Sequence, residues 1–191
     1  MSWPVVVLIV AGALLLRERL TSEPRATGDR ERYHNQSFRV VRVVDGDTMD
    51  IDLPDLTTGK DTTRLRLWGV DTPEIAHGGT HTMHFGPEAT AFAKKTLLGR
   101  SVHIVLSPEK TRGKYGRLLT YIYDERGGTM FNESLLRQGF AYADSRFPHL
   151  YKRDFAAIEK RARRERVGLW ESVELQQMPK WRQRRESRDA P

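Results

Sequence analysis

The chain has 191 residues, a length that supports one domain of common size with extensions at its ends. It carries 32 Lys and Arg residues against 25 Asp and Glu residues, and the formal net charge of +7 favours polyanionic partners and attracts them at long range. The sequence contains no cysteine, which excludes disulfide bonds and leaves the redox state of the compartment open.

An apolar run over residues 3–16 opens the chain and ends at Arg17-Glu18-Arg19. The run is shorter than the roughly 20 residues that a helix needs to cross hydrocarbon, and no Lys or Arg precedes it, as one does in a typical signal peptide. A signal-peptide core, a short uncleaved membrane anchor and a buried helix are all open, and we favour secretion or membrane attachment. We assign residues 1–16 to this segment and the polar, charged residues 17–36 to a linker.

A folded domain is expected over residues 37–171, and it begins with strands. β-branched and apolar residues predict strands over Phe38–Leu53, Thr62–Val70, Ser101–Ser107 and Leu118–Tyr123. The first strand is broken at Asp45-Gly46, where glycine supplies the backbone angles of a turn or a bulge.

Helical patterns fill the rest of the domain. One helix is expected to start at Gly86-Pro87-Glu88 and to end at Leu98-Gly99, because proline favours an early helical position and glycine ends a helix. A second covers Met130 to Gln138, and a third opens at Pro148. Apolar residues recur along this third helix as a buried stripe: Tyr151, Phe155, Ile158 and Ala162.

The basic residues 172–191 are predicted to form a flexible tail. The strands and helices together predict an α+β fold, mainly β, in which a five-stranded barrel of the oligonucleotide-binding (OB) type carries about three packed helices.

Charged side chains gather where the first two predicted strands break or end. The break at Gly46 can aim Asp45 and Asp47 at one spot. Alternation along the second strand places Arg66 on the face opposite to the strand's leucines. This strand ends in Asp71-Thr72-Pro73-Glu74, where proline rules out a ladder hydrogen bond and leaves the two carboxylates in a loop.

These residues are chemically suited to a metal ion. Asp47 and Asp71 supply hard anionic oxygens, and the Thr72 carbonyl can add a neutral one. Calcium accepts such a ligand set when water fills the remaining positions, and magnesium is its close competitor.

Other residues are suited to a phosphodiester. Arg66 and Arg117 can fork onto phosphate oxygens and neutralise the charge that grows on phosphorus, which lysine does less well. Glu74 can orient or deprotonate a water molecule for in-line attack. The residues therefore predict metal-assisted phosphodiester hydrolysis.

Each feature also has a purely structural interpretation. Asp45-Gly46-Asp47 alone could be a turn, and Asp71-Thr72-Pro73-Glu74 alone could begin a helix. Arg66 and Arg117 could cover apolar surface with their stems. The joint occurrence of all these residues argues against coincidence.

Their spacing resembles that of the staphylococcal nuclease (thermonuclease) family. The resemblance rests on Val44-Asp45-Gly46-Asp47-Thr48, on Arg66 five residues before Asp71, and on Lys114-Tyr115-Gly116-Arg117. Further similar pieces are Phe85-Gly86-Pro87-Glu88-Ala89, the run from Asn132 to Gly139, and Gly168-Leu169-Trp170. The resemblance covers roughly Phe38 to Glu171.

The resemblance implies a role for each residue. Asp47 and Asp71 would bind calcium with the Thr72 carbonyl, while Asp45 supports the site from behind. Glu74 would be the general base or water orienter, and Arg66 and Arg117 would bind the scissile phosphate and stabilise its transition state. We also expect Lys114 and Tyr115 to contact the substrate.

The implied substrates are DNA and RNA, preferably single-stranded, cleaved with low sequence specificity into 3′-phosphorylated products by a monomer. The alternative is an inactive module of the same fold that binds single-stranded nucleic acid or a protein partner. The intact set of carboxylates and arginines favours the enzyme, because a binding module needs neither a metal site nor a base.

Overall fold

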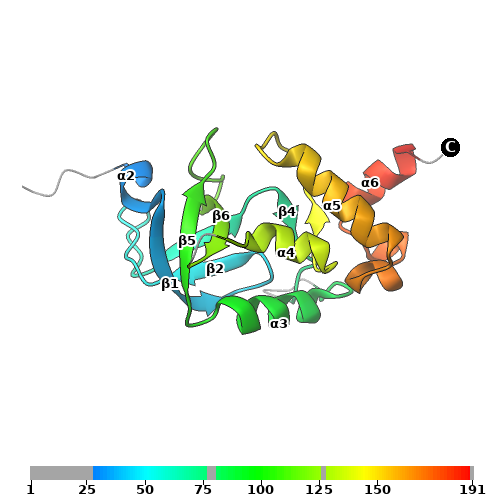
Figure 1. Ribbon diagram of the computed structural model, residues 1–191, viewed down its shortest axis with the longest axis horizontal. Coiled ribbons are helices and arrows are strands. Elements are labelled where there is room, and N and C mark those ends of the chain that lie inside the picture. Colours follow the sequence, from blue (N-terminus) through cyan, green and yellow to red (C-terminus); the bar gives the residue numbers. More distant parts are fainter. Residues whose placement is uncertain (1–27, 77–80, 126–127, 190–191) are drawn as a thin grey trace, which may run out of the picture.

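The structure is a computed structural model that describes residues 28–76, 81–125 and 128–189. Five strands close into a barrel (Figure 1). In their order around the barrel they are β1 (Gln36–Val43), β2 (Thr48–Ile51), β3 (Thr63–Leu67), β6 (Leu118–Asp124) and β5 (Ser101–Leu106). Neighbouring strands are antiparallel, except that β3 and β6 run parallel. The predicted five-stranded barrel is confirmed.

Alternation along the strands fills the barrel with apolar side chains. On β3, Leu65 and Leu67 are buried, while Arg64 and Arg66 are only partly buried. On β5 the same period of two buries Val102 and places its neighbours nearer to solvent. The arginine and the leucine faces of β3 are therefore separated as the sequence predicts.

The three predicted helices are present as α3 (Gly86–Leu97), α4 (Phe131–Arg137) and α5 (Lys152–Arg164), and they pack beside the barrel and on one another (Figure 1). The buried Asn132 holds α4 in place. Its Oδ1 accepts a hydrogen bond from Ile122 N over 3.1 Å, and its Nδ2 donates to the Trp68 carbonyl over 3.0 Å. Because a buried amide without partners is costly, these bonds fix where the helix lies on the barrel.

The folded unit begins earlier than the sequence predicts. Residues of the expected linker form helix α2 (Asp29–Tyr33), and the Tyr33 side chain is only 1% exposed. Asp29 pairs with Arg112 over 2.8 Å, and Arg112 also pairs with Asp55 over 2.8 Å. The prediction of a linker is wrong for residues 29–33. Tyr33 is the one buried side chain of this charged helix, and one buried residue gives no periodic pattern of apolar residues in the sequence.

A chain that starts at residue 37 should therefore be less stable than a chain that starts at residue 28. The shorter chain loses the buried Tyr33 and the Asp29 partner of Arg112. Removing a buried aromatic side chain costs about 3–5 kcal/mol, so we expect a loss of at least about 3 kcal/mol. Urea unfolding of the two chains measures the difference, and equal free energies of unfolding would contradict a structural role for α2.

The C-terminal segment is also ordered in the structure. Two short 3-10 helices, η1 (Gly168–Glu171) and η2 (Leu175–Gln177), lead into helix α6 (Lys180–Asp189) where a flexible tail was expected. Arg182 is 5% exposed and pairs over 3.0 Å with the buried Glu159 of α5. Glu159 in turn accepts a hydrogen bond from Ala143 N over 3.1 Å. The buried ion pair between Arg182 and Glu159 thus holds the basic helix α6 against the domain, and the sequence of α6 alone does not predict this contact.

A two-stranded sheet links this C-terminal part to the end of the barrel. In it β4 (Val70–Asp71) pairs with β7 (Tyr142–Ala143), and Asp71 lies opposite Tyr142. Glu159 binds both Ala143 N of β7 and Arg182 of α6, so α6 lies close to Asp71, which the sequence predicts to bind metal.

Within residues 28–76, 81–125 and 128–189, no helix is both long enough and apolar enough to span a membrane. The apolar segment predicted over residues 3–16 lies outside the described residues.

Candidate active site

The bend between β1 and β2 holds Asp47 in place. Asp47 N donates to Asp45 Oδ1 over 3.1 Å, and Asp47 Oδ2 accepts from Thr72 N over 2.8 Å. A Cβ at Gly46 would lie 2.8 Å from the Thr72 side chain, so only glycine lets Thr72 pack over the bend. The Asp-Gly-Asp sequence and the Asp-Thr-Pro-Glu sequence thus meet in space.

Arg66 lies between two carboxylates. Its guanidinium pairs with Asp47 Oδ1 and, over 2.5 Å, with Asp71 Oδ1. Asp47 is 1% exposed and Asp71 is 8% exposed. Since a buried carboxylate without a partner is costly, the charge of Arg66 stabilises both acids. The structure therefore brings these three predicted residues together.

Asp71 has two further partners that the sequence did not predict. Its Oδ2 accepts a hydrogen bond from Trp181 Nε1 of α6 over 2.7 Å, and an Arg146 nitrogen lies 3.2 Å from the same oxygen. The Arg146 guanidinium also lies 4.6 Å from the centre of the Trp181 ring. The signal available in the sequence was a tryptophan within a basic run, which we assigned to a tail.

Glu74 lies in the loop that leads from β4 to α3. Its carbonyl accepts a hydrogen bond from Met83 N over 2.8 Å, and a Cβ at Gly86 would lie 2.5 Å from that carbonyl oxygen. Gly86 therefore lets the start of α3 approach the loop closely, which fixes the backbone of Glu74. The sequence predicted Gly86 only as a helix start. No helix begins at Asp71-Thr72-Pro73-Glu74.

The charged residues of the site shift the pKa of Glu74. Desolvation of the Glu74 carboxyl group and the negative charges of Asp45 and Asp71 raise this pKa, and the positive charges of Arg66 and Arg117 oppose the rise. Burial likewise raises the pKa of Asp45, and the Arg66 charge opposes that shift. A higher pKa makes a carboxylate a stronger base.

Arg117 lies in the loop between β5 and β6 and is half-buried. Burial and the positive charge of Arg66 lower the pKa of Arg117, while Asp45 and Glu74 oppose this. Its Nε is buried, and within the described part of the chain it has no hydrogen-bond partner. Arg117 is thus a cation whose donors are not all used by the protein.

A cavity of about 330 Å³ opens beside Arg117, with Tyr115 and Arg64 in its wall. Tyr115 is 74% exposed, and its ring lies 5.7 Å from the Arg117 guanidinium carbon. Lys114 Nζ lies 5.6 Å from the same ring. Of the two residues expected to contact substrate, Tyr115 therefore borders a cavity next to the predicted phosphate-binding arginine, and Lys114 lies beside the Tyr115 ring.

Oxygens suited to a hard cation are present but engaged. The four carboxylate oxygens of Asp47 and Asp71 all contact protein donors. Among the residues that the structure describes, no three His, Cys, Asp or Glu side chains form a group that could hold a metal ion. A cation between Asp47 and Asp71 would require Arg66 to turn away.

The closed barrel and its charged site define an α+β protein of the OB-barrel class. A family model described as "Staphylococcal nuclease homologue" matches residues 64–172, more than half of the chain. The chain therefore belongs to the staphylococcal nuclease family, as the resemblance predicted.

Similar proteins cover most of the chain. The thermonuclease of Staphylococcus hyicus is 30% identical over 86% of this chain and 94% of its own length. The thermonuclease of Staphylococcus intermedius is 32% identical over 87% and 95%, respectively. The micrococcal nuclease of Shigella flexneri is 31% identical over 75% of this chain and 78% of its own length.

Proposed function

We propose that this chain is a calcium-dependent nuclease that hydrolyses DNA and RNA with low sequence specificity and releases 3′-phosphorylated products. The proposal is carried by one observation, the gathering of carboxylates and arginines around Asp47 and Arg66. Relatives named thermonuclease and micrococcal nuclease support the nuclease activity.

Two arginines supply the positive charge that the transition state needs. The planar fork of Arg117 can donate to two oxygens of the scissile phosphate. Arg66 can join it when its guanidinium turns from Asp47 and Asp71 towards the phosphate. Both arginines then stabilise the charge that develops on the phosphoryl oxygens.

Glu74 acts as the base. Its carboxylate takes a proton from the attacking water while the water oxygen bonds to phosphorus. The bond between phosphorus and the 5′ oxygen breaks, the 5′ oxygen takes up a proton, and the phosphate stays on the 3′ oxygen. The raised pKa of Glu74 brings its proton affinity closer to that needed near neutral pH.

The donor set suits calcium by chemical type. Asp47, Asp71 and the Thr72 carbonyl would hold the ion, and water and substrate oxygens would complete a shell of about six to eight ligands. When bound, the ion would polarise a phosphoryl oxygen and support the negative charge that develops there.

The preferred substrates, the oligomeric state and the cellular location are proposed mainly from the sequence. We propose single-stranded DNA and RNA as preferred substrates, because the net charge of +7 and the OB-type barrel favour them. We also propose a monomer that is exported or attached to a membrane through residues 3–16.

The test mixes the full chain with labelled single-stranded DNA and with RNA in calcium, in magnesium and in excess chelator. Cleavage in calcium that chelator abolishes is the expected result, and cleavage in magnesium alone would assign a different ion. No cleavage in any metal by a folded protein that still binds the strand would identify the inactive binding module. One observation favours that second function, namely the ion pairs that Arg66 forms with both predicted metal ligands.

A further inference from the structure

An open groove of about 740 Å³ runs along the outer face of α6. We call it the α6 groove. Its wall includes Arg146, Lys180, Trp181, Arg184, Ser187 and Arg188. Four of them are positively charged, and no Asp or Glu lines the groove. Arg146 pairs with Asp71 and Asp144, so the unpaired positive charge of the wall comes from the other three.

The two faces of α6 have different partners. Arg182 and Glu186 point towards the domain and pair with charged residues of α5 over 3.0 Å and 2.9 Å. Trp181, Arg184 and Arg188 recur at helical spacing on the other face and line the groove. The face with Arg182 and Glu186 holds α6 against α5, and the positive charges of Arg184 and Arg188 on the other face take no part in that contact.

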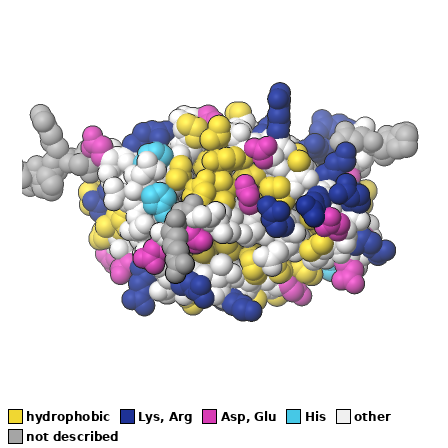
Figure 2. Space-filling view, in the orientation of Figure 1, with side chains coloured by type: hydrophobic (Ala, Val, Ile, Leu, Met, Phe, Trp, Pro, Cys, Tyr) yellow, Lys and Arg dark blue, Asp and Glu magenta, His cyan; other side chains and the backbone are white. Residues whose placement is uncertain are grey.

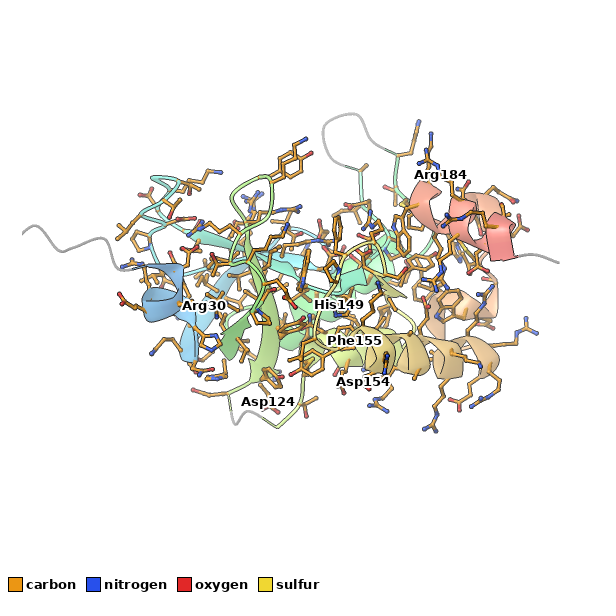
Figure 3. The ribbon with its side chains drawn as sticks, turned by 90° about the horizontal axis from the view of Figure 1, so that it is seen from above. Arg30, Asp124, His149, Asp154, Phe155 and Arg184 are labelled. Atoms are coloured by element: carbon orange, nitrogen blue, oxygen red, sulfur yellow. The ribbon has the colours of Figure 1, made fainter. Side chains whose placement is uncertain are left out.

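Three cations of the groove are exposed. Lys180, Arg184 and Arg188 form no ion pair within residues 28–76, 81–125 and 128–189. Arg184 projects from α6 on the opposite side of the molecule from Asp154 and Phe155 of α5 (Figure 3). Lys and Arg side chains also gather around α5 and α6 on the face shown in Figure 2, so net charge alone does not distinguish the groove.

What distinguishes the α6 groove is its continuity with the candidate active site. Two residues of its wall, Trp181 and Arg146, both contact Asp71 Oδ2, over 2.7 Å and 3.2 Å. A nucleic-acid strand with a phosphate bound at the active site would therefore have the α6 groove directly beside it, on the other side of Trp181 and Arg146. α6 lies outside the residues 64–172 that the family model matches.

We propose that the α6 groove binds the sugar-phosphate backbone of the substrate strand beside the scissile bond, with Arg184 and Arg188 contacting phosphates. This inference rests on the proposed function, because the strand must enter at Asp71. The two arginines are one helical turn apart, about 6 Å along the axis, and their guanidinium forks suit phosphate oxygens. A basic groove with an aromatic side chain is typical of single-strand binding.

The test measures binding without cleavage, in the full chain that carries Glu74→Gln. Fluorescence anisotropy with single-stranded DNA of about 16 nucleotides, the upper end of the site size of one OB fold, gives Kd at several salt concentrations. Arg184→Gln with Arg188→Gln is compared with Lys160→Gln with Arg164→Gln. The second pair removes the same charge from exposed positions of α5.

The groove pair is expected to raise Kd on the order of tenfold and to reduce the slope of log K against log salt by about 1.4, since a single-strand phosphate contact contributes about 0.7. The α5 pair should keep the parent slope. Equal slopes for the two pairs, or no strand binding by the parent, would overturn the inference. Unchanged strand affinity with lost binding to phosphatidylserine vesicles would overturn it in favour of a membrane-binding surface.

The two proposals fail separately. If the groove pair weakens strand binding but the chain with Glu74 intact cleaves nothing, the nuclease is rejected and the α6 groove stands. If that chain cleaves and the two pairs bind alike, the groove is rejected and the nuclease stands.

Discussion

The Glu74→Gln variant is expected to lose turnover by about 10²–10⁴-fold, the usual contribution of general base catalysis. The amide keeps the volume of the carboxylate but cannot take a proton from water. The raised pKa of Glu74 means that its charge does not stabilise the folded state, so the substitution should lower the free energy of unfolding by less than about 0.5 kcal/mol. Single-turnover cleavage of labelled single-stranded DNA in calcium measures the loss, and urea unfolding checks the fold.

Glu88→Gln is the matched control. Glu88 is an exposed acid in the first turn of α3, close to Glu74 in the chain, and the substitution removes the same charge. We expect this variant to cleave at the wild-type rate. Wild-type turnover in Glu74→Gln would reject Glu74 as the base.

Arg117→Lys is expected to lower kcat by about 10²–10³-fold, the range found when one transition-state donor is removed. Lysine keeps the positive charge, but it is a point charge and cannot contact two phosphate oxygens with one planar group. The loss should appear in kcat more than in KM, because the extra bond matters most as charge develops on the phosphoryl oxygens. Steady-state kinetics on single-stranded DNA separates the two constants.

Arg39→Lys provides the comparison for Arg117→Lys. Arg39 is exposed on β1 and should tolerate the change without loss of activity. Full activity of Arg117→Lys would reject the proposal that Arg117 stabilises the transition state. A rise in KM alone would assign Arg117 to substrate binding instead.

Arg66 illustrates why residue type alone leaves a role undecided. The resemblance implies that Arg66 binds phosphate, whereas in the structure it neutralises two buried carboxylates. Both roles use the same charge, because Asp47 and Asp71 need a cation when they are buried. If the chain binds calcium as we propose, Arg66 must first release these carboxylates, and that requirement comes from the positions of the three side chains and not from their identities.

The sequence alone predicted the barrel and most of the candidate site, because both depend on local signals. The period of two on β3 separated Arg66 from the leucines, and Gly46 and Pro73 marked where the chain leaves its strands. Short-range spacing of this kind is visible in a linear sequence. It therefore identified which acids and arginines could meet.

Only the tertiary structure decided the ends of the domain and the surroundings of Asp71. Arg112 binds Asp29, 83 positions away, and Trp181 binds Asp71, 110 positions away. Neither α2 nor α6 has an apolar period of its own, and each is held by charged groups that find partners in the folded chain. Such pairs depend on distances that exist only after folding, because a buried charge is stabilised by whichever group the fold brings beside it.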